Sequence, residues 1–342
     1  MQQAHVEDSL DPRRIPTTTL IGWRQYVDAE PAALNLIDHG RYEALAPDEQ
    51  AAYDDCRMAY HSELVTIETS AVKNIVRQGK ILTLVNQREC GARRSMIVSG
   101  PWATGKTTTI KLLGRLHERD VRRKYPNQER IPVVYITTPP KGSPRKLAAE
   151  FAHFLGISYK PRANVADIAD SVCHVLTEMR TDLVIVDEIH NLNLATSAGE
   201  DMSDHLKYFT EHMPATFIYA GINVDRSGLF TGIRGQQISA RSVLMRTGSF
   251  PNNDEWEALV AGLEAALRLY RHKHGTLIKN SKYLHQRTSG SISGLSYLVR
   301  TAAISAILTR DEAITRDLLH SIPIDHASET LTTTASGTRA KP

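Results

Sequence analysis

SMIVSGPWATGKTTTIKLLGRL, residues 95–116, contains a change of hydrophobic period that sets the fold class. Its first part, 95–100, is a short apolar run that ends in glycine and is typical of a buried strand. GPWATGKT, residues 100–107, then fits the pattern G-x-x-x-x-G-K-[ST], and a helix is expected from this loop to Pro126. A strand that enters this pattern and a helix that leaves it predict a loop that cradles phosphates.

Each part of this loop suits a nucleoside triphosphate for a physical reason. The glycines at 100 and 105 let backbone N–H groups face the phosphates, and the helix amino terminus adds positive partial charge. Lys106 is expected to reach the β- and γ-phosphates, and the Thr107 hydroxyl is expected to ligate Mg²⁺. The alternative is a glycine-rich turn that matches by chance, because the pattern constrains only four of its eight positions. The expected cofactor-binding residues are Gly100, Pro101, Trp102, Ala103, Thr104, Gly105, Lys106, Thr107 and Thr108.

A second apolar run, LVIVDE at 183–188, ends in two carboxylates. Ligands of open α/β sheets bind at the carboxyl ends of the strands, so Asp187 is expected to hold Mg²⁺ through a water. Glu188 is expected to polarise the water that attacks the γ-phosphate. Two ordinary acids at an exposed strand end are the alternative, but the phosphate loop about 80 residues earlier favours the functional interpretation. The second acid, and the lack of an N-K-x-D guanine-reading motif, favour ATP over GTP and hydrolysis over binding alone.

Strands and helices alternate beyond the phosphate loop. Further strands are expected at 133–137, 183–188 and 215–221, with a shorter one inside 242–250. This alternation predicts an α/β fold, a parallel sheet flanked by helices on both faces. The expected organisation is a flexible arm at 1–20, a helical N-terminal segment at 21–90, a P-loop core at 91–251, a small all-α lid domain at 252–322 and a disordered tail at 323–342.

Composition narrows the class of protein. An apolar fraction of 41% supports a real core. The sequence contains no run of about 18 apolar residues, so no membrane span is expected. The N-terminus also lacks a secretory signal, so a cytoplasmic protein is expected. Cys56, Cys90 and Cys173 are far apart and form no CxxC pair, which favours reduced thiols over a disulfide frame or a zinc site. A formal net charge of +3 does not by itself indicate nucleic-acid binding, although clustered basic residues leave room for a local patch.

Several segments together resemble AAA+ ATPases of the TniB/TnsC transposition family, with the MuB-type and helicase-loader-type ATPases as related groups. They are GPWATGKTT at 100–108, DEIHNL at 187–192, QQISAR at 236–241 and TSGSISGLSYLVRTAA at 288–303. The segment YHSELVTIETSAVKNIV at 60–76 also looks like the helical lead-in of TniB-like proteins. The resemblance covers roughly residues 50–310 and implies an AAA+ core followed by a helical lid.

The resemblance implies two further catalytic residues. Asn223, after the fourth strand, matches a polar sensor of the attacking water or the γ-phosphate, and a turn asparagine is the alternative. Arg241 matches an arginine that a neighbouring subunit supplies to the γ-phosphate, where a cation stabilises phosphoryl transfer. Arg234 and Arg246 compete for this role, and a surface salt bridge is the alternative for each.

The lid departs from the family pattern. Many AAA+ lids carry an arginine that senses nucleotide at the start of their last helix, and the equivalent position here falls around Gly294. Arg300 lies two turns further on. The usual coupling of the lid to nucleotide is therefore in doubt, whereas ATP binding is not.

Two basic stretches bear on partners. The family implies that loops near PPKGSPRK, residues 139–146, touch a DNA backbone, so Lys141, Arg145 and Lys146 are candidate phosphate contacts. Such contacts position a protein without reading sequence, and they are sensitive to salt. A solvated face is the equal alternative there, and it is the preferred interpretation of the basic stretch at 111–124.

The expected function is an ATPase that uses ATP and Mg²⁺, forms a homo-oligomeric ring or filament on double-stranded DNA, and recruits a transposase. Hydrolysis would then dismantle the assembly. Transposase and DNA come from the resemblance alone. The alternatives are a signalling or defence switch NTPase that binds no DNA, and a helicase loader that prefers single strands.

Overall fold

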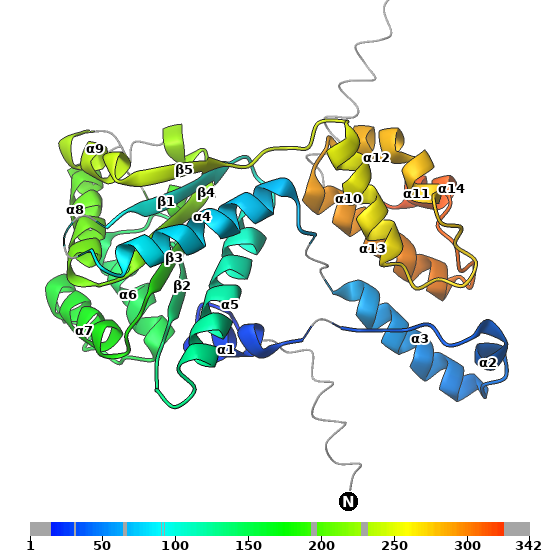
Figure 1. Ribbon diagram of the computed structural model, residues 1–342, viewed down its shortest axis with the longest axis horizontal. Coiled ribbons are helices and arrows are strands. Elements are labelled where there is room, and N and C mark those ends of the chain that lie inside the picture. The colour runs from blue at the N-terminus through cyan, green and yellow to red at the C-terminus, as the bar shows by residue number, and fades with distance from the viewer. Residues whose placement is uncertain are drawn as a thin grey trace, which may run out of the picture. The chain divides into compact units, whose positions relative to one another are not determined.

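The computed structural model describes residues 15–30, 32–63, 67–89, 91, 93–192, 197–226 and 232–324 (Figure 1). The chain forms two compact units. The first contains residues up to 29, residues 74–100 and residues 106–246, and the second contains residues 30–73, 101–105 and those from 247 onward. Most of the arm expected at 1–20, nearly all of the tail expected at 323–342, and Cys90 lie outside the described residues.

The first unit is built on a parallel sheet of five strands in the order β2-β3-β4-β1-β5. The strands are β1 Ser95–Gly100, β2 Val133–Thr137, β3 Leu183–Asp187, β4 Thr216–Ile222 and β5 Ser242–Arg246. The first four are buried almost throughout, as their unbroken apolar runs require of strands that are covered on both faces. The predicted α/β fold with a parallel sheet is confirmed.

Helices cover both faces of this sheet (Figure 1). The helices of the first unit are α1 Leu20–Asp28, most of α4 Ser70–Asn86, α5 Lys106–Lys124, α6 Pro144–Leu155, α7 Val165–Glu178, α8 Ser197–His212 and α9 Gly232–Ala240, with 3-10 turns at Ile189–Asn191 and Val224–Arg226. α5 packs on one face, where a Cβ added at Gly114 would lie 2.9 Å from Ile185. α6 and α8 pack on the other face.

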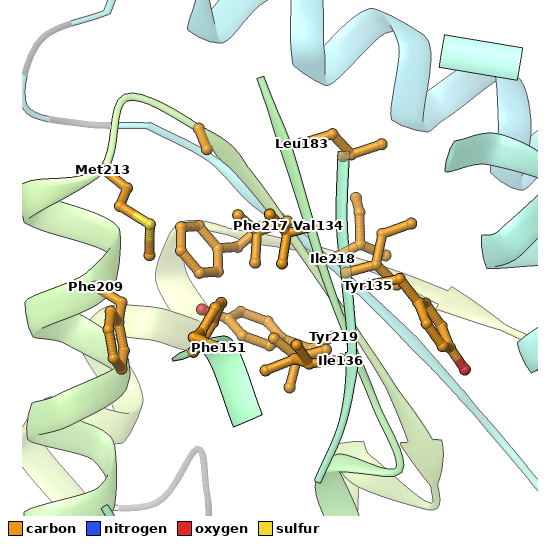
Figure 2. Close-up of a cluster of buried hydrophobic side chains, with 14 of the residues drawn as sticks. Val134, Tyr135, Ile136, Phe151, Leu183, Phe209, Met213, Phe217, Ile218 and Tyr219 are labelled. Carbon is orange, nitrogen blue, oxygen red and sulfur yellow. The ribbon is translucent and has the colours of Figure 1, made fainter. Parts of the chain in front are cut away.

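An aromatic cluster fills the second face. Phe151 of α6 and Phe209 of α8 have ring centroids 4.7 Å apart, and both are fully buried (Figure 2). Phe217 and Tyr219 are two residues apart on β4, so their side chains point to the same side of the sheet and join this cluster (Figure 2). Fully burying aromatic rings of this size contributes much of the apolar driving force for a domain of this type.

α1 is held on the opposite face by a buried polar contact. The indole Nε1 of Trp23 donates to Glu118 Oε2 at 2.5 Å, and its ring stacks on Tyr135 of β2 with centroids 5.7 Å apart. Burial raises the pKa of Glu118, while Trp23 and Arg122 oppose that shift. Arg115 and Arg119 of α5 also donate to the carbonyls of Val27 and Ala29. The interpretation of 111–124 as a solvated face is therefore wrong for these two arginines, because they cap the carboxyl end of α1.

The second unit is all-helical. It contains α2 His39–Glu43, α3 Pro47–Ser62, α10 Asp254–Ala265, α11 Thr276–Lys279, α12 Ser281–Thr288, α13 Ile292–Leu308 and α14 Arg316–Ser321. α3 packs along α13, although more than 200 residues separate them in sequence. Arg57 of α3 is fully buried and donates to Glu312 Oε1 at 2.9 Å and Oε2 at 2.5 Å, and to Asp54 at 2.9 Å. The helical segment expected at 21–90 is thus shared between the units.

Within the described residues, no single helix is long and apolar enough to cross a membrane. One pair, α12 and α13, meets that test together by length and composition, and its two helices are bent by 118°. Among the described residues, Cys56 is an exposed thiol and Cys173 a buried one.

Candidate nucleotide-binding site

Parallel pairing brings the predicted functional residues to one edge of the sheet. Gly100 at the end of β1 is in register with Ile222 at the end of β4, and Thr137 of β2 is in register with Asp187 of β3. The end of β1 and the acidic pair after β3 therefore lie at the same carboxyl edge of the sheet, where open α/β sheets bind ligands.

Lys106 starts α5 and points back toward this edge. The residue is 7% exposed, and its ammonium group donates to the carbonyl of Gly100 at 3.0 Å. Burial lowers the pKa of Lys106, and the nearby carboxylates of Glu188 and Asp187 oppose that shift. A buried ammonium group beside two acids is suited to bind phosphate oxygens.

Thr107 and Asp187, the two predicted magnesium ligands, are in direct contact. The Thr107 hydroxyl donates to Asp187 Oδ2 at 2.8 Å, and the Tyr135 hydroxyl donates to the same oxygen at 2.9 Å. Burial and then the charge of Asp187 raise the pKa of Tyr135, which keeps this hydroxyl protonated as a donor. A hydroxyl and a carboxylate are the oxygen ligands that Mg²⁺ prefers, so these side chains fit that cation. The sequence interpretation missed Tyr135, whose only signal was its place on the neighbouring strand.

Glu188 follows directly, in the left-handed backbone region at φ 55°. Its backbone N–H donates to Asp187 Oδ1 at 2.9 Å, and its side chain is 38% exposed. Non-glycine residues in this region are uncommon and cluster at functional sites. His190 Nε2 lies 3.3 Å from Glu188 Oε2. His190 is part of the quoted DEIHNL segment, but no role was predicted for it.

The predicted sensor, Asn223, follows β4 at the same edge. It also has a positive φ, 46°, and its backbone N–H donates to Gly100 O at 3.4 Å. Nearby, Asp225 accepts from Ser99 Oγ at 2.5 Å and from Arg246 at 3.1 Å, and these contacts lower the pKa of Asp225. Arg246, one competitor for the arginine role, is thus paired within its own chain.

The structure places Arg241 at the other end of the sheet. It precedes β5, and its guanidinium donates to Gly91 O at 3.3 Å near the start of β1. It lines a cavity of about 530 Å³ together with three other basic residues, Arg93, Arg94 and Lys207. Arg241 therefore does not join the phosphate loop of its own chain. The side chain of Arg234 lies outside the described residues.

The middle of the phosphate loop, residues 101–105, packs within the second unit. Thr104 Oγ1 lies 2.8 Å from Thr247 Oγ1, and Ser291 at the start of α13 donates to Ala103 O at 3.3 Å. Gly105 has a φ of +79°, so a side chain there would be strained. Pro101 and Trp102 are exposed, whereas Thr108, in the first turn of α5, is half-buried.

Gly294 and Arg300, the two lid positions compared with a nucleotide-sensing arginine, both make hydrogen bonds within the second unit. Gly294 is buried in the first turn of α13, where its backbone N–H donates to Ser291 Oγ at 3.2 Å. Arg300 donates instead to the carbonyls of His61 and Ser62 at the end of α3, and burial lowers its pKa. In this structure, Arg300 supports α3.

The cations of the basic stretch at 139–146 differ in the contacts that they make within the chain. Arg145 donates to the carbonyls of Ala163 and Pro161, so its guanidinium organises the loop between α6 and α7. Lys141 is exposed, and Lys146 Nζ lies 3.5 Å from the carbonyl of Lys141. The loop that Arg145 supports carries two further cations, Lys160 and Arg162, on the rim of a cavity of about 450 Å³. The sequence interpretation missed these two, because only the tertiary fold brings them beside 139–146.

A parallel five-stranded sheet with a phosphate loop after β1, an acidic pair after β3 and a separate helical unit defines a P-loop ATPase of the AAA+ class. Within that class, the model of the family described as "Bacterial TniB protein" matches residues 57–241, more than half of the sequence. The chain therefore belongs to the TniB family.

Solved structures agree on the fold. The chain is similar to the ORC2 protein of Aeropyrum pernix in ADPNP–ADP complexes, with a TM-score of 0.59 and 14% identity over 84% of this chain and 74% of that chain. It is also similar to the Aeropyrum pernix ORC1 protein in complex with DNA, with a TM-score of 0.56 and 14% identity over 83% and 70% of the two chains. Cdc6p of Pyrobaculum aerophilum has a TM-score of 0.56 and 14% identity over 85% and 76%. No curated protein matches the sequence.

Proposed function

We propose that this protein is a Mg²⁺-dependent ATPase that oligomerises with ATP on double-stranded DNA and regulates transposition by recruiting a transposase. The observation that carries the ATPase part is the contact of Thr107 with Asp187 beside Glu188, at the edge where Lys106 and Gly100 lie. Lys106 would bind the β- and γ-phosphates, and Thr107 and Asp187 would hold Mg²⁺. The metal would neutralise charge on the transferred phosphoryl group, and Glu188 would orient and deprotonate the attacking water.

Oligomerisation is proposed because neither Arg241 nor Arg246, as the structure places them, supplies an arginine to the γ-phosphate of its own chain's site. Phosphoryl transfer is strongly accelerated by an arginine at the γ-phosphate. At the described carboxyl edge, Arg246 is paired with Asp225, whereas Arg241 lies at the opposite end of the sheet in a basic cavity. A neighbouring copy would therefore supply Arg241 to this site, so that ATP joins two subunits and hydrolysis loosens them.

DNA binding is proposed from the cations around α6 and α7. Lys141 precedes α6 and Lys146 lies in its first turn, whereas Lys160 and Arg162 lie in the loop between α6 and α7. Arg145 of α6 donates to two carbonyls of that loop. Exposed Tyr159 lies among them, 41% exposed. The ORC1 protein that shares this fold is described in complex with DNA. TniB family membership adds transposition, with a transposase as partner and the cytoplasm as the place of action.

One experiment tests these steps together. Binding to a fluorescent duplex is measured by anisotropy over a range of salt, with Mg²⁺–ADPNP, with ADP or without nucleotide. We expect binding that requires ADPNP and falls steeply with salt, because phosphate contacts release counterions. Replacing Lys160 and Arg162 with alanine is expected to reduce the salt slope by about 1 for each lost contact. Replacing Lys279 and Lys282, which are exposed on α11 and α12, serves as the matched control.

The outcomes separate the alternatives. Absence of DNA binding at any salt, with normal ATP turnover, would favour the switch NTPase. Tighter binding to single strands than to duplex would favour the helicase loader. An equal loss in the control pair would remove the specific role of the loops around α6 and α7. Absence of both nucleotide binding and turnover would refute the proposal as a whole.

A further inference from the structure

His190 connects two elements of the candidate site that are otherwise separate in sequence. It lies in the 3-10 turn that follows β3, two residues after Glu188, and its side chain is 24% exposed. Its Nδ1 accepts a hydrogen bond from the backbone N–H of Ile222 at 3.2 Å, while its Nε2 lies 3.3 Å from Glu188 Oε2. One ring therefore touches the predicted water-activating carboxylate and the last residue of β4.

The position on β4 explains why a side chain is needed there. The ladder between β3 and β4 ends at the pair Val186 and Tyr219, because β3 stops at Asp187. β4 continues to Ile222, so its last N–H group on that side has no strand residue opposite it. The His190 ring accepts a hydrogen bond from this N–H group, so a side chain replaces the strand partner that β3 does not provide.

The hydrogen bond also determines where the ring proton lies. Nδ1 accepts from Ile222, so it carries no proton in the neutral ring. The proton is then on Nε2, which faces the Glu188 carboxylate. The ring therefore presents a donor to Glu188 without needing to be charged.

Gly221 provides the room for this arrangement. A Cβ at that position would lie 3.1 Å from His190 Nδ1, 3.2 Å from His190 N and 2.9 Å from Val224 Cγ2. These distances are shorter than ordinary van der Waals contacts, so a larger residue would displace either the ring or the turn. The approach of His190 to β4 thus depends on a glycine in the strand.

We propose that His190 is a positioning residue that holds the Glu188 carboxylate at a fixed place relative to the end of β4, which carries Asn223. A glutamate side chain has several rotatable bonds, and ordering it costs conformational free energy. A donor fixed by β4 supplies that order before ATP arrives. The inference rests on the proposed ATPase function and adds a residue that acts through Glu188.

The test compares variants that keep one of the two contacts. His190→Asn retains an acceptor for Ile222 N–H but is too short to reach Glu188, whereas His190→Gln can bring an amide N–H to the carboxylate. Steady-state and single-turnover ATP hydrolysis give kcat and KM, and calorimetry with Mg²⁺–ADPNP gives Kd. His190→Asn is expected to lower kcat about 10- to 100-fold, as removal of an outer partner of a catalytic group does, with Kd unchanged. His190→Gln is expected to recover part of this loss, and Gly221→Ala to reproduce it.

A double-mutant comparison shows whether His190 acts through Glu188. In a Glu188→Gln background, His190→Asn is expected to have little further effect on the single-turnover rate. In a Lys279→Ala background, which changes an exposed residue of α11 outside the proposed site, His190→Asn is expected to lower the rate by the same factor as in the wild type.

Several results would overturn the inference. They are an unchanged or raised kcat in His190→Asn, an equal loss in the Glu188→Gln background, and a weakening of ADPNP binding that matches the loss of rate. Failure of the proposed function is a different result: the wild type would then hydrolyse no ATP, or Glu188→Gln would hydrolyse it at the wild-type rate.

Discussion

Protonation of His61 is predicted to destabilise the helical unit in mildly acidic solution. The residue lies near the end of α3, is 5% exposed, and its Nε2 accepts the backbone N–H of Arg268 at 3.3 Å. Burial, followed by the charge of Arg57, lowers the pKa of His61 to about 4 from an ordinary value of 6.5. A proton on Nε2 would remove the acceptor and place a second cation beside Arg57.

The sign and size of the effect follow from this shift. Because the folded pKa is below the unfolded one, the unfolded chain binds more protons between about pH 4 and 6.5, and stability rises with pH across that window. The contribution is complete above about pH 6.5 and is lost as the pH falls toward about 4. At about 1.4 kcal/mol for each pKa unit, the full change is about 3 kcal/mol.

Urea unfolding followed by circular dichroism, at several pH values across this window, measures the change. His61→Gln retains an acceptor and cannot take up a proton, so the difference in unfolding free energy between wild type and variant isolates the histidine. We expect that difference to fall by about 3 kcal/mol from the top of the window to the bottom. His174, which is exposed on α7, is the control, and His174→Gln should follow the wild type. Parallel curves for wild type and His61→Gln would refute the reasoning.

Three further predictions concern the ATP site and the buried ion pair. Lys106→Ala should weaken ATP binding about 10- to 100-fold in calorimetry, because a charge-assisted hydrogen bond is lost, and unchanged affinity would contradict the assignment. Glu188→Gln should bind ATP normally, lower kcat about 100-fold or more and keep the ATP-bound oligomer in sedimentation; normal turnover would exclude Glu188 as the activating base. Arg57→Leu should cost about 3–5 kcal/mol in urea unfolding, because Glu312 stays buried without its partner. Arg57→Leu combined with Glu312→Leu should recover much of that cost, and a double variant as unstable as the single one would contradict this account.

The fold class could be predicted because its signals are local. The run 95–100 and the run 183–188 are apolar throughout, which is what a strand buried on both faces requires. The loop at 100–107 indicates a phosphate ligand, because the glycines, the lysine and the hydroxyl of the motif are neighbours in sequence. Parallel strands share a carboxyl edge, so Thr107 and Asp187 could be expected at the same edge of the sheet, whereas their direct contact depends on the strand order.

Other features depend on segments that are distant in sequence. Arg145 was a candidate for DNA contact by composition, but the turn between α6 and α7 offers its guanidinium two carbonyl acceptors that lie 16 and 18 residues away in sequence. Likewise, α3 reads as part of an N-terminal segment, yet Arg57 finds Glu312 at the far end of the chain. Neither partner carries a pattern that identifies the other.

The amino-acid sequence by itself determined the phosphate loop, the acidic pair and the α/β class, because each depends on residues that are adjacent along the chain or on the two-sided burial of one strand. Only the tertiary structure decided that β4 extends beyond β3, that His190 takes up the N–H group of Ile222, and that Arg241 lies far from its own chain's site. Those relations depend on the order and length of paired strands, which long-range hydrogen bonds and burial select together.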